Sequence, residues 1–244
     1  MPYVKKTYVG TSGWQYKHWY EVFYPESVKS NELLEYYSQH FSSVELNASF
    51  YHLPKASVFA GWHKKTPNNF LFSVKASRYI THIKKLRDFE AGWTRFIEAA
   101  KELKEKLGPI LFQLPPFLKA NKEVLETALK VLPKDYKYAF EFRHESWFVE
   151  EIYDILKKYN IALVMADSPD FPLKKEITAD FIYLRFHGSK SLYGSKYTVE
   201  ELKSWAKEIT SWQKQGIEIY AYFNNDAEGY AVENARELIK ILSD

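Results

Sequence analysis

The sequence predicts an α/β fold, a single (β/α)8 barrel of the TIM type, and three observations lead to it. The chain has 244 residues, close to the roughly 250 residues of a typical barrel of this kind. Short β-rich runs alternate with helical patterns, which requires parallel strands joined by crossover connections. Most of the runs also end on a polar residue, at the end of the strand where such barrels carry their active sites. We therefore expect one domain over residues 1–244.

The strands are predicted from apolar runs that are bounded by Gly, Pro and polar residues. Eight such runs occur, at residues 8–10, 43–47, 70–75, 110–114, 138–143, 162–167, 181–187 and 219–225. Each run is followed by a longer segment before the next one begins. This arrangement favours a closed barrel over an open doubly wound sheet.

The helices are predicted from apolar residues that recur every three or four positions. Clear patterns lie at residues 89–107, 121–132, 198–209 and 230–242. The first pattern is stopped by Gly108 and Pro109, and Thr198 with Glu201 forms a capping box at the start of the third. Residues 168–179 contain two prolines, so we expect at least one irregular connection between strands.

Composition excludes several classes of protein. Hydrophobic residues make up 46% of the chain and aromatic residues 18%, which indicates a packed core and not disorder. The absence of Cys excludes disulfides, thiolate nucleophiles and cysteine metal sites. No apolar run is long enough to span a membrane or to form a secretory signal, so we expect a cytoplasmic protein without a membrane partner. A net charge of +3 falls short of the basic surface of a typical nucleic-acid-binding protein.

Strand parity predicts a polar cluster inside one end of the barrel. Successive side chains on a strand face opposite sides, and the inward set includes polar residues near the strand ends. They are Glu45, Asn47, Lys75, Gln113, Glu141, Arg143, Asp167, Arg185, His187 and Asn224. We expect these side chains to converge at the carboxyl-terminal mouth, where barrel enzymes bind their substrates.

The predicted mouth balances carboxylates against fixed cations. The charged set consists of Glu45, Glu141 and Asp167 against Lys75, Arg143 and Arg185. Ions in a barrel interior need partners, so one interpretation is a purely structural ion-pair network. A core built for stability alone would use branched apolar residues there, which favours a functional role.

Five of these residues are candidates for catalysis, namely Glu45, Lys75, Glu141, Asp167 and His187. A glutamate beside a cation is suited to act as general base, and paired carboxylates also allow glycosidase-like chemistry. His187 is expected to exchange protons near neutral pH. Lys75 would need a lowered pKa to attack a carbonyl group as a Schiff-base amine.

The cations and the loop after the seventh strand suggest an anion site. Arginine presents a planar fork to phosphate or carboxylate, and Arg143 and Arg185 form the natural pair. Residues 188–197 are rich in Gly, Ser, Lys and Tyr and follow the strand after which barrels often bind phosphate. An ordinary exposed loop is the alternative interpretation of this segment.

The order of short motifs along the chain resembles the YecE-like family, known as domain of unknown function 72. The motifs are GTSGW (10–14), VELN (44–47), FSVK (72–75), QLPP (113–116), EFRHESW (141–147), YLRFHG (183–188) and YFNND (222–226). The resemblance covers essentially the whole chain. It implies a TIM-type barrel, loosely similar to the barrels of endonuclease IV and xylose isomerase, and it supplies no settled reaction.

Several polar and aromatic residues near the strand ends are candidates for ligand binding. They are Asn47, Tyr51, Gln113, Arg143, His144, Trp147, Arg185, Tyr193, Asn224 and Asn225. Amides and arginines orient polar groups, and aromatic rings can stack against a base or a sugar. At least half of the loop aromatics are expected to serve packing instead.

The interpretation that these residues favour is an enzyme for a small polar or anionic ligand, bearing phosphate or carboxylate, that uses acid–base or hydrolytic chemistry. We expect no metal cofactor, because three fixed cations in the mouth would repel a divalent ion. Two alternatives stay open. One is a metal-dependent phosphodiesterase or nuclease similar to endonuclease IV, and the other is a non-catalytic module that binds nucleic acid or nucleotides.

Overall fold

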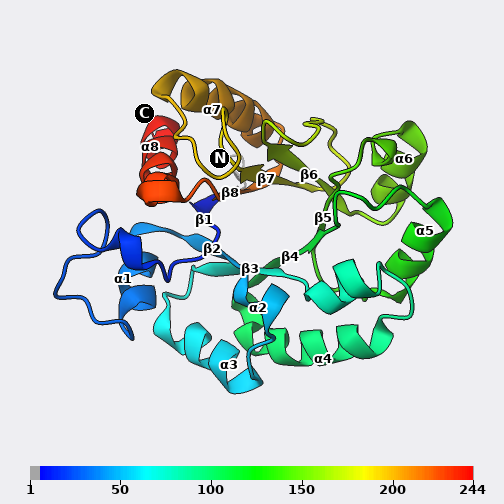
Figure 1. The fold of residues 1–244 in the computed structure, drawn as a ribbon, viewed down its shortest axis with the longest axis horizontal. Helices are drawn as coiled ribbons and strands as arrows, with labels where there is room; N and C mark the ends of the chain where they lie inside the picture. Colours follow the sequence, from blue (N-terminus) through cyan, green and yellow to red (C-terminus); the bar gives the residue numbers. More distant parts are fainter. Residues whose placement is uncertain (1–5, 244) are drawn as a thin grey trace.

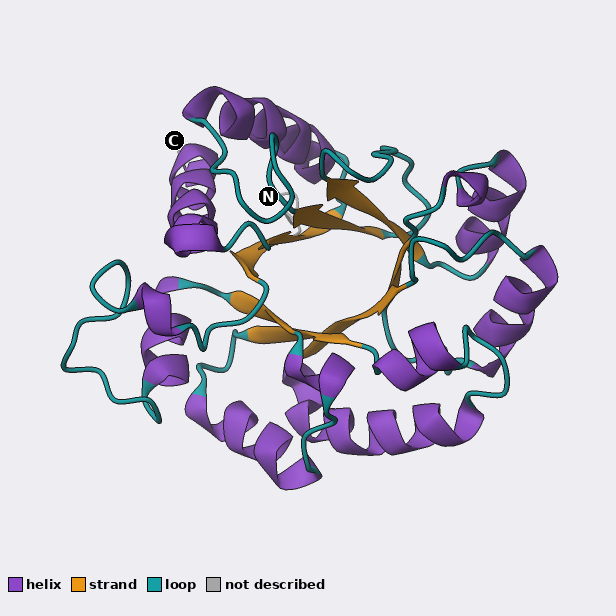
Figure 2. Cartoon of the chain, viewed as in Figure 1, coloured by secondary structure: helices purple, strands orange, loops and turns teal. Residues whose placement is uncertain are grey.

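The computed structural model describes residues 6–243, which form a nearly closed ring of parallel strands surrounded by helices (Figures 1 and 2). The strands are β1 (Thr7–Thr11), β2 (Ser43–Leu46), β3 (Leu71–Lys75), β4 (Leu107–Gln113), β5 (Tyr138–Glu141), β6 (Ala162–Asp167), β7 (Phe181–Phe186) and β8 (Glu218–Phe223). The predicted (β/α)8 fold class is therefore confirmed.

The helices lie outside the strands and connect them (Figure 2). They are α1 (Leu33–His40), α2 (Ala48–Tyr51), α3 (Ala56–Lys65), α4 (Glu90–Ala100), α5 (Lys122–Val131), α6 (Glu150–Lys158), α7 (Val199–Lys214) and α8 (Tyr230–Ser243). The predicted capping box is present at α7, where Glu201 N–H donates to Thr198 Oγ1 at 3.2 Å and Thr198 N–H donates to Glu201 Oε2 at 2.7 Å. Within residues 6–243, no helix combines the length and the apolar character that a membrane crossing requires.

Hydrogen bonding runs without interruption from β2 through β3 to β8 and then to β1. The two strands at the ends of this order, β1 and β2, are joined through a side chain. The Tyr37 hydroxyl accepts the Thr11 N–H at 2.9 Å and donates to the Ser43 carbonyl at 3.1 Å. Gly10 allows this close approach, because a Cβ atom there would lie 2.0 Å from the Ser43 carbonyl oxygen.

Two connections test the predictions made from the sequence: one predicted helix is shorter than expected, and one expected irregular connection is present. The helix predicted over residues 89–107 ends at Ala100, and a 3-10 segment follows in which Lys104 has φ +53°. That kink lets β4 begin at Leu107, so Gly108 and Pro109 lie inside the strand instead of merely ending the helix. Residues 168–179 contain no helix, which confirms the expected irregular connection.

The interior of the barrel is apolar in its lower part. Inward residues form a separate cluster in which small or aliphatic side chains on β4, β5 and β6 face aromatic ones on β7 and β8: Leu111, Ala139, Ala162, Val164, Ala166, Phe181, Tyr183, Tyr220 and Tyr222. The Tyr222 hydroxyl bonds to Ser43 Oγ at 2.6 Å and to Ser73 Oγ at 2.7 Å, and so ties β8 to β2 and β3 across the interior. Below this cluster Lys137 pairs with Glu218, whose Oε2 also accepts the Tyr220 hydroxyl at 3.0 Å, and the charged layer of the mouth lies above the cluster.

Candidate active site

Arg185 on β7 occupies the centre of that charged layer. Its side chain is only 1% exposed, and each of its three guanidinium nitrogens donates to a carboxylate. Nε and Nη2 bind the two oxygens of Glu45 at 2.9 and 2.8 Å, while Nη1 binds Glu141. The expectation that Arg185 presents its fork to a ligand anion is therefore wrong, because the fork is held by the protein's own carboxylates.

The two carboxylates are held in their charged forms. Burial alone would raise their pKa values, but the Arg185 guanidinium outweighs it, and the pKa of Glu45 is lowered and that of Glu141 lies well below its usual range. Glu45 also accepts hydrogen bonds from Ser12 Oγ at 2.7 Å and from the Tyr183 hydroxyl at 2.8 Å. Carboxylates stabilised in this way are weak bases near neutral pH, which argues against the general-base role considered for them.

His187 lies fully buried next to this network. Asn224 Nδ2 lies 3.2 Å from His187 Nδ1, and Glu141 Oε2 lies 3.9 Å from Nε2. Burial, together with the nearby Arg185, lowers the pKa of His187 to about 4. The imidazole is then neutral at pH 7, which argues against the proton exchange expected of this residue near neutral pH.

Lys75, at the end of β3, differs from the other mouth charges. Its Nζ donates to Gln113 Oε1 at 2.7 Å and lies 4.2 Å from the centroid of the Phe50 ring. It forms no ion pair with a carboxylate of the described chain. Burial, and then the Arg185 charge, lower the pKa of Lys75 to about 7. Both forms of the amine are therefore populated near neutral pH.

A cavity of about 370 Å³ opens above Lys75 at the carboxyl ends of the strands. Seven of its lining residues are ones that the sequence predicted, namely Asn47, Tyr51, Lys75, Gln113, Arg185, Tyr193 and Asn224. The amide and phenol groups among them can hold polar atoms of a ligand in fixed directions. A cavity of this size is suited to a small molecule.

Two lining residues, Tyr16 and Asp226, were missed as site residues. Asp226 Oδ1 accepts a hydrogen bond from Trp19 Nε1 at 2.7 Å, and Oδ2 lies 3.0 Å from His18 Nε2. Burial raises the pKa of this carboxyl. Asp226 follows the end of β8 by three residues, where strand parity no longer applies, and the YFNND motif was the one signal that contained it.

Comparison with known proteins identifies the family. The family described as protein of unknown function DUF72 matches residues 8–244.

The chain belongs to the DUF72 family.

Its relatives include the UPF0759 proteins YunF of Bacillus subtilis, 28% identical over 96% of this chain and 94% of that protein, and YecE of Escherichia coli K12, 26% identical over 85% and 82%. A DUF72 family protein of Thermotoga maritima is 34% identical and has a crystal structure that matches 98% of this chain and 99% of that one with a TM-score of 0.87. A second structure, from Enterococcus faecalis, shares the fold at 24% identity over 98% of both chains, with a TM-score of 0.82. These likenesses establish the family and the fold, and none of the names states a reaction.

Asp167 was predicted to be catalytic, but in this DUF72 barrel it lies on the outer side of β6 and not in the mouth. On β6 the inward residues are Ala162, Val164 and Ala166, so Asp167 faces the helices. There its Oδ2 accepts a hydrogen bond from Trp205 Nε1 at 2.8 Å. The inward placement predicted for it is wrong by one residue, because β6 has small or apolar residues on both faces and its sequence does not show which face is inward.

Three predicted ligand-binding residues serve the fold in the DUF72 structure. Trp147 stacks on Phe142 with ring centroids 4.4 Å apart, and its Nε1 donates to the Leu118 carbonyl at 2.7 Å. His144 caps the short turn that follows β5, through Ser146 N–H at 3.2 Å.

The third, Asn225, is buried and fastens the loop after β7. Its Nδ2 donates to the Ser195 carbonyl and to Asn234 Oδ1, both at 2.9 Å. None of the three lines the mouth cavity, so the structure places these residues outside the candidate site.

Arg143 lies beside the cavity and not in its lining. Its Nε donates to Glu141 Oε1 at 2.7 Å, and Nη2 lies 3.4 Å from the Tyr193 hydroxyl. The guanidinium carbon stacks 4.2 Å from the centroid of the Phe171 ring. Arg143 therefore contributes positive charge to the edge of the mouth, while its Nε is bound by Glu141.

The loop over residues 188–197 uses several of its backbone amides internally. Ser195 Oγ accepts the N–H groups of Lys190 and Ser191 at 3.0 and 3.1 Å, and the Gly188 N–H donates to the Tyr197 hydroxyl at 3.2 Å. These amides are unavailable to a phosphate. The phosphate-loop interpretation is therefore wrong for these amides, and Tyr193 is the residue through which the loop lines the cavity.

The mouth does not offer the ligands of a catalytic metal site. In the described part of the chain no group of three or more His, Asp and Glu side chains is arranged to hold a metal ion. The two mouth glutamates face Arg185, and Asp167 lies on the other side of the sheet. The donor set therefore does not fit a metal-dependent phosphodiesterase similar to endonuclease IV.

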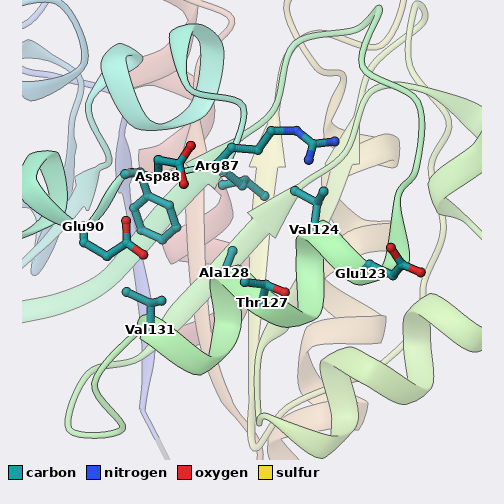
Figure 3. Close-up of a pocket in the computed structure, with 10 residues that line it drawn as sticks. Arg87, Asp88, Glu90, Glu123, Val124, Thr127, Ala128 and Val131 are labelled. Carbon is teal, nitrogen blue, oxygen red and sulfur yellow. The ribbon is translucent and has the colours of Figure 1, made fainter.

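A separate hollow of about 310 Å³ lies on the outside of the barrel, between residues 86–90 and α5 (Figure 3). Arg87, Asp88 and Glu90 lie on one side of it, and α5 supplies Glu123 and Thr127 on the other (Figure 3). None of the predicted site residues lines this hollow. The mouth cavity, where the predicted residues meet, is the candidate active site.

Proposed function

We propose that this DUF72 protein is an enzyme that binds a small polar, anionic molecule in the mouth cavity and transforms it by metal-independent acid–base chemistry, with Lys75 exchanging the proton. The observation that carries the proposal is the environment of Lys75 Nζ. This amine lies in the cavity lining and bonds to an amide oxygen, while the neighbouring carboxylates are engaged by arginines.

Lys75 and Asp226 suit this chemistry because their environments act in opposite directions. Burial and Arg185 lower the pKa of Lys75 to about 7, and burial raises the pKa of Asp226. General acid–base catalysis is most efficient when the pKa of the group lies near the working pH. Two titratable groups whose pKa values move towards neutrality in one cavity are candidates for the base and the acid of a reaction.

The anionic character of the ligand is supported by the field on the β3 side of the mouth. His82 lies half-buried there, and its pKa is lowered to about 4 by burial and then by the charges of Lys75, Arg78 and Arg143. A phosphate or carboxylate in the cavity would offset this positive potential. Asn47, Gln113 and Asn224 would then orient the remaining polar atoms of the ligand.

The test is a thermal-stability screen with small phosphates and carboxylates, followed by turnover assays on the compounds that stabilise the protein. A ligand that binds the native state raises its melting temperature. We expect stabilisation of the wild type that is largely lost in Lys75→Met and retained in Lys203→Met, which removes an exposed lysine from α7. Turnover should increase with pH through about 7.

Equal stabilisation of the wild type and Lys75→Met would contradict the role of Lys75, and loss of turnover on treatment with a chelator would contradict the metal-independent reaction. Borohydride treatment in the presence of a carbonyl compound adds a further distinction. A covalent mass increase at Lys75 would mean that the amine attacks the carbonyl carbon with release of water, instead of exchanging a proton.

A further inference from the structure

Exposed apolar and aromatic side chains gather at the β3–β4 side of the mouth. We call this surface the aromatic rim and define it by Tyr51, Tyr79, Ile83 and Phe117. Their exposed fractions are 73%, 40%, 60% and 66%, respectively. They belong to three connections that follow β2, β3 and β4. Large apolar side chains exposed in one region commonly mark an interaction surface.

The rim is interleaved with cations and lacks carboxylates. Residues 77–85 and 115–120 together contain four Lys and Arg residues and no Asp or Glu: Arg78, Lys84, Lys85 and Lys119. Lys85 Nζ lies 5.2 Å from the centroid of the Phe117 ring, and Lys84 Nζ lies 5.9 Å from that of Tyr79. Two of the four cations, Lys84 and Lys85, therefore lie beside exposed rings.

The four cations differ from the surface lysines that are held in ion pairs. Eight other lysines pair with glutamates, namely Lys65, Lys101, Lys122, Lys137, Lys157, Lys158, Lys175 and Lys196. The rim cations form no ion pair with any carboxylate within residues 6–243. Their charges are thus available to an anionic partner.

The backbone holds these side chains outward in an uncommon conformation. Tyr79–Ile83 forms a π-helical turn, a form that is frequent at functional sites. Lys85 and Leu86 follow with φ of +50° and +66°, a region that costs about 1 kcal/mol or more for each non-glycine residue. The Tyr79 ring packs against Gly92 of α4, where a Cβ atom would lie 2.6 Å from it. The backbone conformation of this turn therefore determines where the side chains of Tyr79 and Ile83 lie.

We propose that the aromatic rim binds single-stranded nucleic acid, with bases stacked on its rings and phosphates held by Arg78, Lys84, Lys85 and Lys119. Positive charge interleaved with aromatic rings is the combination by which proteins hold single strands. A single strand exposes both base faces and phosphates, whereas a duplex hides the base faces. The rim also borders a concave mouth, which suits a flexible chain better than a flat bilayer.

The rim is continuous with the mouth cavity through Phe50. The Phe50 ring lies 4.9 Å from the Tyr51 ring and 5.0 Å from the His82 ring, and it also contacts Lys75. A strand on the rim would therefore pass beside the cavity. The binding proposed here stands independently of the chemistry proposed for Lys75.

The experiment measures fluorescence anisotropy of a labelled 20-nucleotide oligo(dT) at several salt concentrations. We expect binding whose logarithmic salt dependence has a slope of about −0.7 for each phosphate neutralised. The double variant Lys84→Glu/Lys85→Glu should weaken binding at least tenfold. Phe117→Ala should weaken it roughly fivefold or more, as expected for the loss of one stacked base.

A matched control changes the same charge elsewhere. Lys203→Glu/Lys207→Glu alters two exposed lysines on the outer face of α7 and should change affinity less than twofold. Lys84→Glu/Lys85→Glu should keep the ligand-induced stabilisation that Lys75→Met loses, which separates this proposal from the one for the cavity. Circular dichroism and the melting temperature confirm that each variant is folded.

Three results would overturn the proposal. The first is absence of oligo(dT) binding at low salt, and the second is an equal loss of affinity in the α7 control, which would mean non-specific attraction. The third is flotation with phosphatidylserine vesicles without oligonucleotide binding, which would assign the rim to an anionic lipid surface instead.

Discussion

The centre of the mouth and its β3 side both bury charges, but the charges at the centre have counter-ions and the charge on the β3 side has none among the described residues. At the centre, Arg185 gives each guanidinium nitrogen to a carboxylate of Glu45 or Glu141. On the β3 side, Lys75 has an amide oxygen and an aromatic ring as neighbours. The pKa values follow this difference, since the carboxylates are held charged and the Lys75 amine is brought to about 7.

The comparison indicates how structural and reactive charges can be told apart in one cavity. A fully paired charge changes its protonation state only at extreme pH, so its main effect is on stability. A buried charge without a counter-ion changes its protonation state near neutral pH, which is what proton transfer requires. Substitutions of Arg185, Lys75 and Asp167 distinguish the two kinds of charge.

Arg185→Met should cause the largest loss of stability. It leaves Glu45 and Glu141 buried without their main partner, and breaking a buried pair in this way costs about 3–5 kcal/mol. Urea unfolding at pH 7 measures the change. The loss should become smaller at acidic pH, where the two carboxyl groups can be protonated. A change below about 1 kcal/mol at pH 7 would show that Arg185 is not the structural centre.

Lys75→Met should change how stability depends on pH. The pKa of Lys75 is about 7 in the folded protein, against 10.5 for the free side chain, so between these values the unfolded chain binds more protons. Stability of the wild type relative to the variant should therefore rise as pH increases from 7 to 10, by about 3 kcal/mol. Below pH 7 the difference between the two proteins should be constant.

The pKa behind this prediction can be measured directly. Reductive ¹³C-methylation of the lysines, followed by NMR titration, should give one signal with a pKa near 7 that is missing from Lys75→Arg. A Lys75 signal that titrates above about 10 would remove the distinction between the two parts of the mouth.

Asp167→Ala should have the smallest effect. It removes the hydrogen bond that Trp205 Nε1 donates on the outer side of β6, and a hydrogen bond of this kind contributes about 1 kcal/mol. Ligand-induced stabilisation through the mouth should remain within the error of the wild type. A loss of ligand binding as large as that in Lys75→Met would return Asp167 to the active site.

The fold could be predicted because strand and helix periodicities and their alternation are local signals. The inward parity of β7 and β8 followed directly from alternating side chains, and it correctly placed Arg185, His187 and Tyr222. The same rule failed at Asp167, because β6 has small or apolar residues on both faces and so offers no alternation from which to read its inward side.

The partners within the mouth could not be predicted in the same way. Parity brings Glu45, Glu141, Arg185 and Lys75 to one layer, but the choice of partners depends on distances across the barrel that sequence spacing does not contain. Asp226 lies beyond the end of β8, in a turn with no regular period. The significance of the cations of the aromatic rim could not be predicted either, since it rests on their forming no ion pair within residues 6–243, which sequence spacing does not reveal.

The pairing of β1 with β8 has a consequence for how the protein is made. Along residues 7–11, the strand ladder of β1 is formed with residues 219–223, and β2 contributes no ladder to it. During synthesis β1 therefore emerges long before β8, and its strand ladder cannot form until residues 219–223 have left the ribosome. Ring closure is thus a late, non-local step of folding. A nascent chain stalled before Glu218 would display β1 as an open edge, a substrate for chaperones and a site for aggregation.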